Sequence, residues 1–288
     1  MFRDILKTLK INHYVKNLIV VIPLLFSMSF TNPFLWVKVL LIFLAFCAVS
    51  SAVYVMNDLI DIKKDLLHPI KKNRAIASGR ISKPLAITIL LILFSISLFL
   101  SALLNLPTLL MIVFYFVLNV FYSLYLKNIA IIDATCIAIG FILRIVAGCF
   151  AISVVPSPLV ILLTFFTSLF FTFTKRKLEL SVAKENARQS LKEYNIEVAN
   201  QFIVINAILS IAFYFTYVLD PETVQRAGSQ YLYLTVIPFT LIIYRLLLLI
   251  YTQNIADDPI HFLEKDKSIK YLFVLYFIVL ALVLMFLK

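Results

Sequence analysis

Long hydrophobic runs alternate with short polar segments along the whole 288-residue chain. A helical membrane span needs about 20 consecutive apolar residues, and no segment alternates with the period of a strand over a useful length. We expect Pro23 to kink the first run rather than end it, because helix bundles tolerate such residues. The pattern predicts one all-α domain over residues 1–288, an integral membrane bundle of nine transmembrane helices at 18–35, 37–56, 84–104, 107–126, 131–152, 157–174, 199–219, 231–251 and 270–287.

Charge is sparse and unevenly distributed. The chain is 62% hydrophobic and 14% charged, with a mean hydropathy of +1.01, which excludes an ordinary soluble domain. Of its 26 Lys and Arg residues, 21 lie in the N-terminal segment and in the loops after even-numbered spans. The positive-inside rule therefore predicts a multi-pass protein of the cell membrane, with its N-terminus in the cytoplasm and its C-terminus outside.

The basic side faces anionic lipid headgroups in the bilayer and, we expect, a polyanionic substrate. Nucleic acid is excluded as a partner because no basic stripe alternates with exposed stacking aromatic residues.

Three aspartates directly follow the second run, in the stretch Asn57-Asp58-Leu59-Ile60-Asp61-Ile62-Lys63-Lys64-Asp65. If the helix of the second span continues, Asp58, Asp61 and Asp65 recur at i, i+3 and i+7 and share one face. Like charges at that spacing destabilise a helix by about 0.2–0.5 kcal/mol per pair, so a cation has to offset them. Hard oxygen ligands on one face suit Mg²⁺ holding a phosphorylated substrate. A solvated acidic helix end is the alternative, but it does not need the cations that follow closely, Lys71, Lys72, Arg74 and Arg80.

Polar chemistry is placed at the predicted cytoplasmic ends of the spans. A transporter more often carries ionisable groups or broken helices near the midplane, whereas the predicted spans 84–104, 157–174 and 270–287 have no ionisable residue in their interiors. An enzyme that joins a water-soluble phosphorylated donor to a lipid acceptor needs this arrangement, with its active site at the cytoplasmic face. A non-enzymatic lipid-phosphate carrier also accounts for basic loops and apolar spans, but it does not require clustered aspartates.

An ordered set of motifs resembles the UbiA-type intramembrane prenyltransferases, in particular the decaprenyl-phosphate phosphoribosyltransferase branch. The first is the aspartate motif Asn57-Asp58-x-x-Asp61-x-x-x-Asp65, extended by His68-Pro69-x-Lys71-x-x-Arg74-x-Ile76-Ala77-Ser78-Gly79. The others are Lys16-Asn17, Tyr122-Ser123-x-x-x-Lys127 with Asp133, Gly140-Phe141-x-Leu143-Arg144-x-x-Ala147-Gly148, Lys175-Arg176-x-x-Glu179-Leu180, and the later Arg188, Leu191 and Tyr194. The chain departs from the family at His13-Tyr14, where a Gln-Trp pair is common, and at Ala75, where a proline is common.

The resemblance implies a bundle of nine helices and a phosphoribosyltransferase. The enzyme would transfer 5-phosphoribosyl from phosphoribosyl pyrophosphate to a polyprenyl phosphate of the decaprenyl type, and would release diphosphate. Catalytic roles fall on Asp58, Asp61, Asp65, Lys127 and Asp133, with Mg²⁺ on the first three. Substrate-binding roles fall on Lys16, Asn17, Asn57, Lys71, Arg74, Tyr122, Arg144, Lys175, Arg176, Glu179 and Arg188. The resemblance further implies a role in making a lipid-linked pentose donor for the cell envelope.

Alternatives remain open at several positions. A UbiA-type aromatic prenyltransferase with a polyprenyl diphosphate donor would share the fold and the first aspartate motif. It would also carry a second aspartate-rich motif, whereas Asp133 stands alone and is followed four residues later by Ile137. Arg144 either binds phosphate or makes a structural pair within the bundle, since a charge at that depth is costly unless it is paired. Arg245 is interpreted as structural, and the sequence leaves the oligomeric state and the polyprenyl length undetermined.

Overall fold

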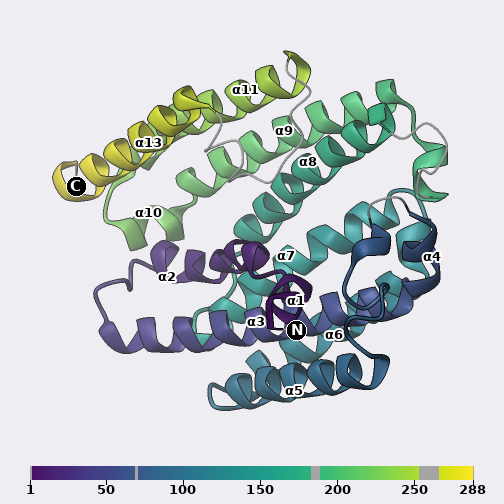
Figure 1. Ribbon diagram of the computed structural model, residues 1–288. Helices are drawn as coiled ribbons and strands as arrows, with labels where there is room; N and C mark the ends of the chain where they lie inside the picture. Colours follow the sequence, from purple (N-terminus) through teal and green to yellow (C-terminus); the bar gives the residue numbers. More distant parts are fainter. Residues whose placement is uncertain (1, 69–70, 183–188, 253–265, 288) are drawn as a thin grey trace. The chain divides into compact units, whose positions relative to one another are not determined.

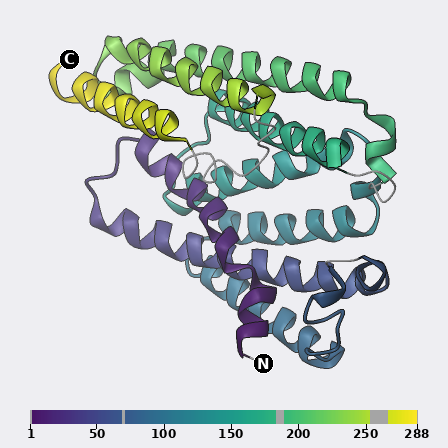
Figure 2. The same cartoon turned by 45° about the horizontal axis from the view of Figure 1, so that its top comes forward.

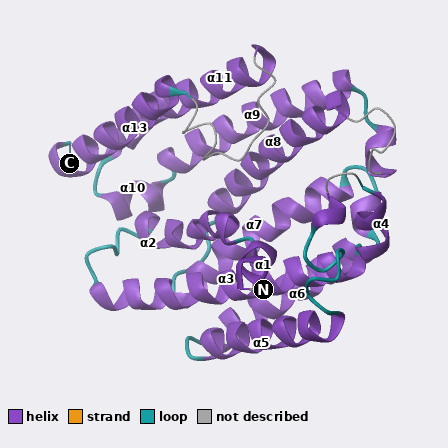
Figure 3. Ribbon diagram, viewed as in Figure 1, coloured by secondary structure: helices purple, strands orange, loops and turns teal. Residues whose placement is uncertain are grey.

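The computed structural model describes residues 2–68, 71–182, 189–252 and 266–287, and this part of the chain folds into helices without a strand (Figures 1 and 3). Within it, nine helical segments are long and apolar enough to cross a membrane. They run over Arg3–Phe26, Pro33–Ile60, Lys83–Ala102, Leu106–Leu124, Ile132–Ala151, Pro158–Ser181, Ile196–Leu219, Gln230–Thr252 and Lys267–Phe286. The predicted all-α bundle with nine spans is thereby confirmed for the described residues.

The predicted first span, 18–35, is wrong at both ends. The segment consists of α1 (Phe2–Leu9), the 3₁₀ helix η1 (Ile11–Val21) and α2 (Ile22–Phe26). Pro23 lies in the first turn of α2, where a missing backbone N–H costs nothing. The first span ends at Phe26, and the predicted bound at residue 35 lies inside the next helix, which begins at Pro33 and is capped by Asn32 through the Phe34 N–H.

Internal contacts divide the chain into two compact units, and one of the boundaries between them falls inside α7 (Ile132–Ala151). Unit 1 comprises Met1–Lys127 and Leu143–Pro156, and unit 2 comprises Asn128–Ile142 and Ser157–Lys288. A single domain over 1–288 stays a prediction.

The centre of unit 1 is α3 (Pro33–Ile60), the most buried of the candidate spans. It packs against α5 (Lys83–Ala102) and α6 (Leu106–Leu124), while the N-terminal segment crosses it in dark purple in Figure 2. Its 28 residues extend about 42 Å, longer than the roughly 30 Å hydrocarbon core. One end of α3 can therefore carry charged residues beyond the apolar layer. The short helices of this unit are α4 (Ile62–Leu67), η2 (Lys71–Asn73) and η3 (Leu126–Asn128), whose last residue already belongs to unit 2.

Unit 2 is built on α8 (Pro158–Val182) and α9 (Ile196–Leu219), which lie side by side, and on α11 (Val236–Thr252), which packs on α13 (Lys267–Phe286) (Figure 1). Its core is a cluster of buried aliphatic and aromatic side chains that includes Phe170, Phe173, Ile203 and Leu249. The connecting helices are η4 (Gln189–Glu193), α10 (Pro221–Ala227) and η5 (Gln230–Thr235).

Candidate active site

The predicted aspartates come together with the predicted cations in unit 1. Nη1 of Arg74 donates to Asp58 Oδ1 and to Asp65 Oδ2, both at 2.9 Å. Both carboxyl side chains are 5% exposed, whereas Arg74 is 32% exposed. Two largely buried carboxylates therefore converge on a single positively charged nitrogen, which compensates their removal from water.

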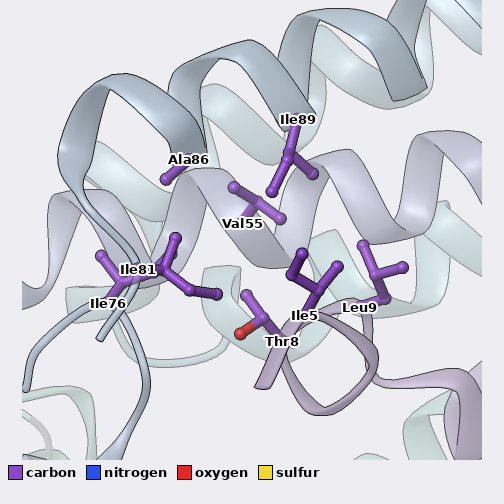
Figure 4. Close-up of a pocket in the computed structure, with 8 residues that line it drawn as sticks. All are labelled: Ile5, Thr8, Leu9, Val55, Ile76, Ile81, Ala86 and Ile89. Carbon is purple, nitrogen blue, oxygen red and sulfur yellow. The ribbon is translucent and has the colours of Figure 1, made fainter. Parts of the chain in front are cut away.

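Local packing brings Arg74 to this position. The next residues, Ala75 and Ile76, are buried with Val55, Ile81 and Ala86 in a small core of unit 1. Figure 4 shows the side chains around a hollow in this core, which are aliphatic except for Thr8. The chain turns back at Gly79, whose φ of +77° favours glycine, and the Ile81 N–H donates to the Ala75 carbonyl. The motif Arg74-x-Ile76-Ala77-Ser78-Gly79 thus anchors a loop that presents its arginine to the aspartates.

The prediction of a continuous helix through Asp65 is wrong, because the helix is interrupted at Asp61. Asp61 has φ −89° and ψ 6°, so α3 ends at Ile60 and α4 begins at Ile62. The break turns Asp61 toward Lys127, whose Nζ lies 2.8 and 2.9 Å from its two carboxylate oxygens. Three aspartates on one helical face are thus replaced by a pair on Arg74 and a single carboxylate on Lys127.

Asn57 and Ser123 connect the aspartate motif to α6. The Ser123 hydroxyl donates to Asn57 Oδ1 and is itself buried. Tyr122, the neighbouring residue, is half-buried, as is Lys71 on η2. Lys63 and Lys64 are exposed. The predicted binding residues Asn57 and Arg74 and the predicted catalytic residue Lys127 therefore make contacts that involve the aspartate motif.

Lys10 is a residue of this cluster that sequence reasoning missed. Its Nζ lies 3.8 Å from Asp58 Oδ1 and 4.5 Å from the centre of the Tyr54 ring. In the sequence Lys10 is only one of the basic residues of the N-terminal segment, and no motif contains it. Lys10 has φ 51°, in the left-handed region, and this backbone turn directs the chain from α1 into η1. Three cations, Lys10, Arg74 and Lys127, thus contact the three aspartates.

Arg144 and Asn17 lie together deeper in unit 1. Arg144 is 7% exposed, and its Nε donates to Asn17 Oδ1 at 2.9 Å. Its Nη2 donates to the hydroxyls of Tyr115 at 2.9 Å and Ser50 at 3.3 Å, and its guanidinium lies over the Phe46 and Tyr115 rings. Asn17 is buried and Lys16 is half-buried. These contacts agree with the structural interpretation of Arg144, in which its side chain is paired within the bundle.

A second polar cluster belongs to unit 2. Asp133 is fully buried, and its Oδ2 accepts from Arg176 Nε at 2.8 Å and from Ser190 Oγ at 3.3 Å. Arg176, 3% exposed, also donates to Glu179 Oε2 at 2.9 Å. Lys175 is half-buried, and the predicted Arg188 lies outside the described residues.

Tyr194 closes this second cluster. Its hydroxyl accepts from the Ile131 N–H, and burial raises the pKa of its phenol above the ordinary value. The side chain therefore remains a neutral hydroxyl over the physiological pH range. Among the described residues, Oδ1 of Asp133 is buried without a hydrogen-bond partner.

Oxygen ligands are thus present in unit 1, but they contact cationic side chains. Within the described residues, no three His, Cys, Asp or Glu side chains form a group that could hold a metal ion as they stand. Asp58 and Asp65 resemble part of such a group, because both converge on Arg74 Nη1.

The model of the UbiA prenyltransferase family matches residues 18–274, which include the aspartate motif and Asp133. The chain belongs to this family. The decaprenyl-phosphate phosphoribosyltransferase of Mycolicibacterium smegmatis is 27% identical over 282 residues, covering 93% of this chain and 88% of that protein. The enzyme of the same name from Mycobacterium tuberculosis is 26% identical, covering 93% and 90%.

A solved structure, that of a UbiA homolog from Archaeoglobus fulgidus bound to DMAPP and Mg²⁺, has the same fold, with a TM-score of 0.69 and 17% identity. The structural match covers 96% of this chain and 98% of the Archaeoglobus fulgidus chain. Family membership, together with the nine candidate spans, makes the chain a multi-pass membrane protein. The resemblance drawn from the motifs is confirmed, since these two curated relatives carry the name of the predicted branch.

Proposed function

We propose that this protein transfers 5-phosphoribosyl from phosphoribosyl pyrophosphate to a polyprenyl phosphate, with release of diphosphate. The choice of this reaction is carried by the similarity to phosphoribosyltransferases over 93% of the chain. The lone Asp133, with Ile137 four residues later, supports the same choice over aromatic prenylation.

In this reaction the bond between the anomeric carbon of ribose and the diphosphate oxygen breaks, and its electron pair leaves with diphosphate. A phosphate oxygen of the lipid forms the new bond to that carbon. A phosphate monoester is already anionic at neutral pH, so the nucleophile needs no side-chain base. The demand on the protein is positive charge around the leaving diphosphate, and Arg74 and Lys127 supply it at the aspartate cluster.

A divalent cation fits the residues at this cluster. The donor set is oxygen-only, and Asp58 and Asp65 already converge on one cationic atom, 2.9 Å from each. We assign Asp58, Asp65 and Asp61 as the residues that would hold Mg²⁺, which would supply charge neutralisation for the leaving diphosphate. Arg74 and Lys127 would then turn from the carboxylates to the phosphate oxygens, because one cationic group cannot fully serve both partners.

The binding residues divide by the chemistry they offer. Lys71, Lys16, Asn57 and Tyr122 are proposed for the donor, whose 5-phosphate and hydroxyls need cations and polar groups. Lys175, Arg176, Glu179 and Asp133 are proposed for the acceptor headgroup, and the buried Oδ1 of Asp133 keeps capacity to accept one more hydrogen bond. The lipid tail would lie among the apolar helices, and the active site would be at the cytoplasmic face.

The decisive experiment offers purified protein two pairs of substrates. Labelled phosphoribosyl pyrophosphate with polyprenyl phosphate and Mg²⁺ should give a lipid-linked product, whereas a prenyl diphosphate with 4-hydroxybenzoate should not. Asp58→Asn should lower turnover by orders of magnitude. Asp4→Asn is a matched control, because Asp4 pairs with Arg80 outside the cluster. Prenyl transfer to the aromatic acid, with no phosphoribosyl transfer, would replace this proposal by the aromatic prenyltransferase.

A further inference from the structure

The first two spans of unit 1 meet along a row of polar contacts that we name the polar seam. It comprises Lys10, His13, Tyr14 and Asn17 of the N-terminal segment, Ser50, Ser51, Tyr54 and Asp58 of α3, and Arg144 of α7. Tyr54 follows Ser50 by four residues and Ser51 by three, and Asp58 follows Tyr54 by four, so the α3 members lie on one side of the helix. Polar side chains inside a membrane protein are costly, which makes a continuous row of them a feature to be explained.

The contacts of the polar seam run from Arg144 toward Asp58. At the deep end, Asn17 Oδ1 accepts from Arg144 Nε at 2.9 Å and from Ser50 Oγ at 3.4 Å. In the middle, the Tyr14 and Ser51 hydroxyls lie 2.8 Å apart, and Ser51 donates to the Leu9 carbonyl at 2.9 Å.

Nearer the aspartates, the Tyr54 hydroxyl lies 3.2 Å from His13 Nδ1, and Lys10 lies over the Tyr54 ring. Lys10 Nζ then lies 3.8 Å from Asp58 Oδ1. The polar seam therefore connects Arg144, which lies away from the aspartates, to a cation that contacts one of them.

The polar seam also explains why eleven residues adopt a 3₁₀ helix, since such runs rarely exceed four residues. Burial along η1 has a period of three: Asn17 and Val20 are buried and Tyr14 is half-buried, whereas Asn12, Val15 and Leu18 are exposed. Residues at i, i+3 and i+6 eclipse one another in a 3₁₀ helix, but drift apart by about 120° in an α-helix. Only the 3₁₀ form keeps Tyr14, Asn17 and Val20 together on the face that meets α3 and α7.

Gly148 allows η1 to pack closely against α7. It lies one turn after Arg144 on α7, and a Cβ at this position would come within 2.6 Å of the Val20 carbonyl oxygen. Arg144 thus binds the side chain of Asn17, while Gly148 admits the backbone of Val20, three residues later on the same face of η1. The two α7 residues fix this end of the segment by a hydrogen bond and by a close approach.

The form of η1 sets how far the segment reaches. A 3₁₀ helix rises about 2.0 Å per residue and an α-helix about 1.5 Å, so the ten steps from Val20 to Lys10 differ in length by about 5 Å. A change of that size would separate Lys10 from Asp58, which are now 3.8 Å apart.

We propose that the polar seam is a positioning device: Arg144, Asn17 and Gly148 hold η1 in its extended 3₁₀ form and thereby place Lys10 at Asp58, where Lys10 binds the diphosphate of the donor. Arg144 and Gly148 are positioning residues, and Lys10 is a further binding residue. This inference rests on the proposed function only in that the donor carries a diphosphate group. It assigns Arg144 no contact with phosphate.

The test measures binding of inorganic diphosphate with Mg²⁺ to purified protein by calorimetry. Both candidate donors carry a diphosphate group and release it as inorganic diphosphate, so the result does not depend on which group is transferred. Lys10→Ala and Gly148→Ala should each weaken binding by about tenfold, since a lost ion contact of this kind is worth about 1.5 kcal/mol. In the Lys10→Ala background, Gly148→Ala should have almost no further effect, because the position of an absent side chain no longer matters.

Two further variants separate positioning from general stability. Ser51→Ala removes the contacts with Tyr14 and with the Leu9 carbonyl in the middle of the polar seam without a steric clash, and it should weaken diphosphate binding several-fold. Arg245→Gln removes a spanning arginine of unit 2, and it should lower the melting temperature while leaving diphosphate affinity unchanged. Additive effects of Lys10→Ala and Gly148→Ala, or unchanged affinity in both single variants, would overturn the proposal. If the effects of Lys10→Ala and Gly148→Ala are non-additive as expected but no phosphoribosyl transfer is found, the positioning role is supported and the proposed reaction is rejected.

Discussion

Arg74 illustrates how one side chain serves both the fold and the chemistry. Its Nη1 compensates two carboxylates that are each 5% exposed. Arg74→Ala should lower the free energy of unfolding by about 1–3 kcal/mol in the presence of a chelator, less than a fully buried pair because Arg74 is itself 32% exposed. Mg²⁺ should restore more of the melting temperature in this variant than in the wild type.

Donor affinity of the same variant should fall by roughly 10- to 150-fold, the effect of one charged hydrogen bond to phosphate. Arg80→Ala provides the comparison, because Arg80 is 48% exposed and pairs with Asp4. If Arg74→Ala destabilises the protein but binds the donor normally, Arg74 only anchors the loop.

Lys127 is expected to act on turnover rather than on donor binding alone. It contacts both oxygens of Asp61, the carboxylate that the break in the helix separates from Asp58 and Asp65. Lys127→Ala should lower kcat at saturating donor, and polyprenol without its phosphate should be a very poor acceptor. Initial rates against each substrate, measured separately, check both expectations. A variant whose kcat is unchanged would exclude Lys127 from the catalytic step.

At the scale of elements, α11 and α13 are joined by an ion pair at a helix end. Asp266 accepts from Arg245 Nη2 at 2.7 Å and caps α13 through the Ile269 N–H. The hydrogen bond from Arg245 is the main cause that holds the pKa of Asp266 below its ordinary value of 3.8. A carboxyl that is more acidic when folded contributes stability above its unfolded pKa, and the contribution is lost as pH falls through its folded pKa.

Asp266→Asn should therefore lower the melting temperature at pH 7, while the difference from the wild type should shrink as the pH falls below about 4. Asparagine retains the capping oxygen, so the comparison isolates the ion pair. Thermal unfolding at a series of pH values measures the difference, and a gap that persists at low pH would mean that the charge is not its source.

For the molecule as a whole, the distribution of Lys and Arg predicts that the 57–83 loop faces the cytoplasm and that the segment containing Arg226 faces outside. The three native cysteines are buried, so background labelling should be low. Lys72→Cys should react with an impermeant thiol reagent only in inverted vesicles, and Arg226→Cys only in right-side-out vesicles. Labelling of both from the same side would contradict the predicted topology.

Sequence alone determined the all-α class, the approximate bounds of eight spans and the family. Each follows from local signals: uninterrupted apolar runs, and motifs whose order is visible along the chain. The aspartates and their cationic partners Arg74 and Lys127 were found because charge is rare enough in this chain to be informative. The sequence also contained the signal for the true start of the second span, Asn32-Pro33, which the length of the apolar run obscured.

Tertiary structure decided what depends on contacts between distant segments. Which cation meets which carboxylate follows from the break at Asp61 and from the loop that Ala75 and Ile76 anchor. The 3₁₀ form of η1 has no strong local signal, because it depends on Arg144 and Gly148, more than a hundred residues away. Lys10 could not be identified as a site residue from the sequence for the same physical reason. Only the packing of the N-terminal segment on α3 brings Lys10 close to Asp58.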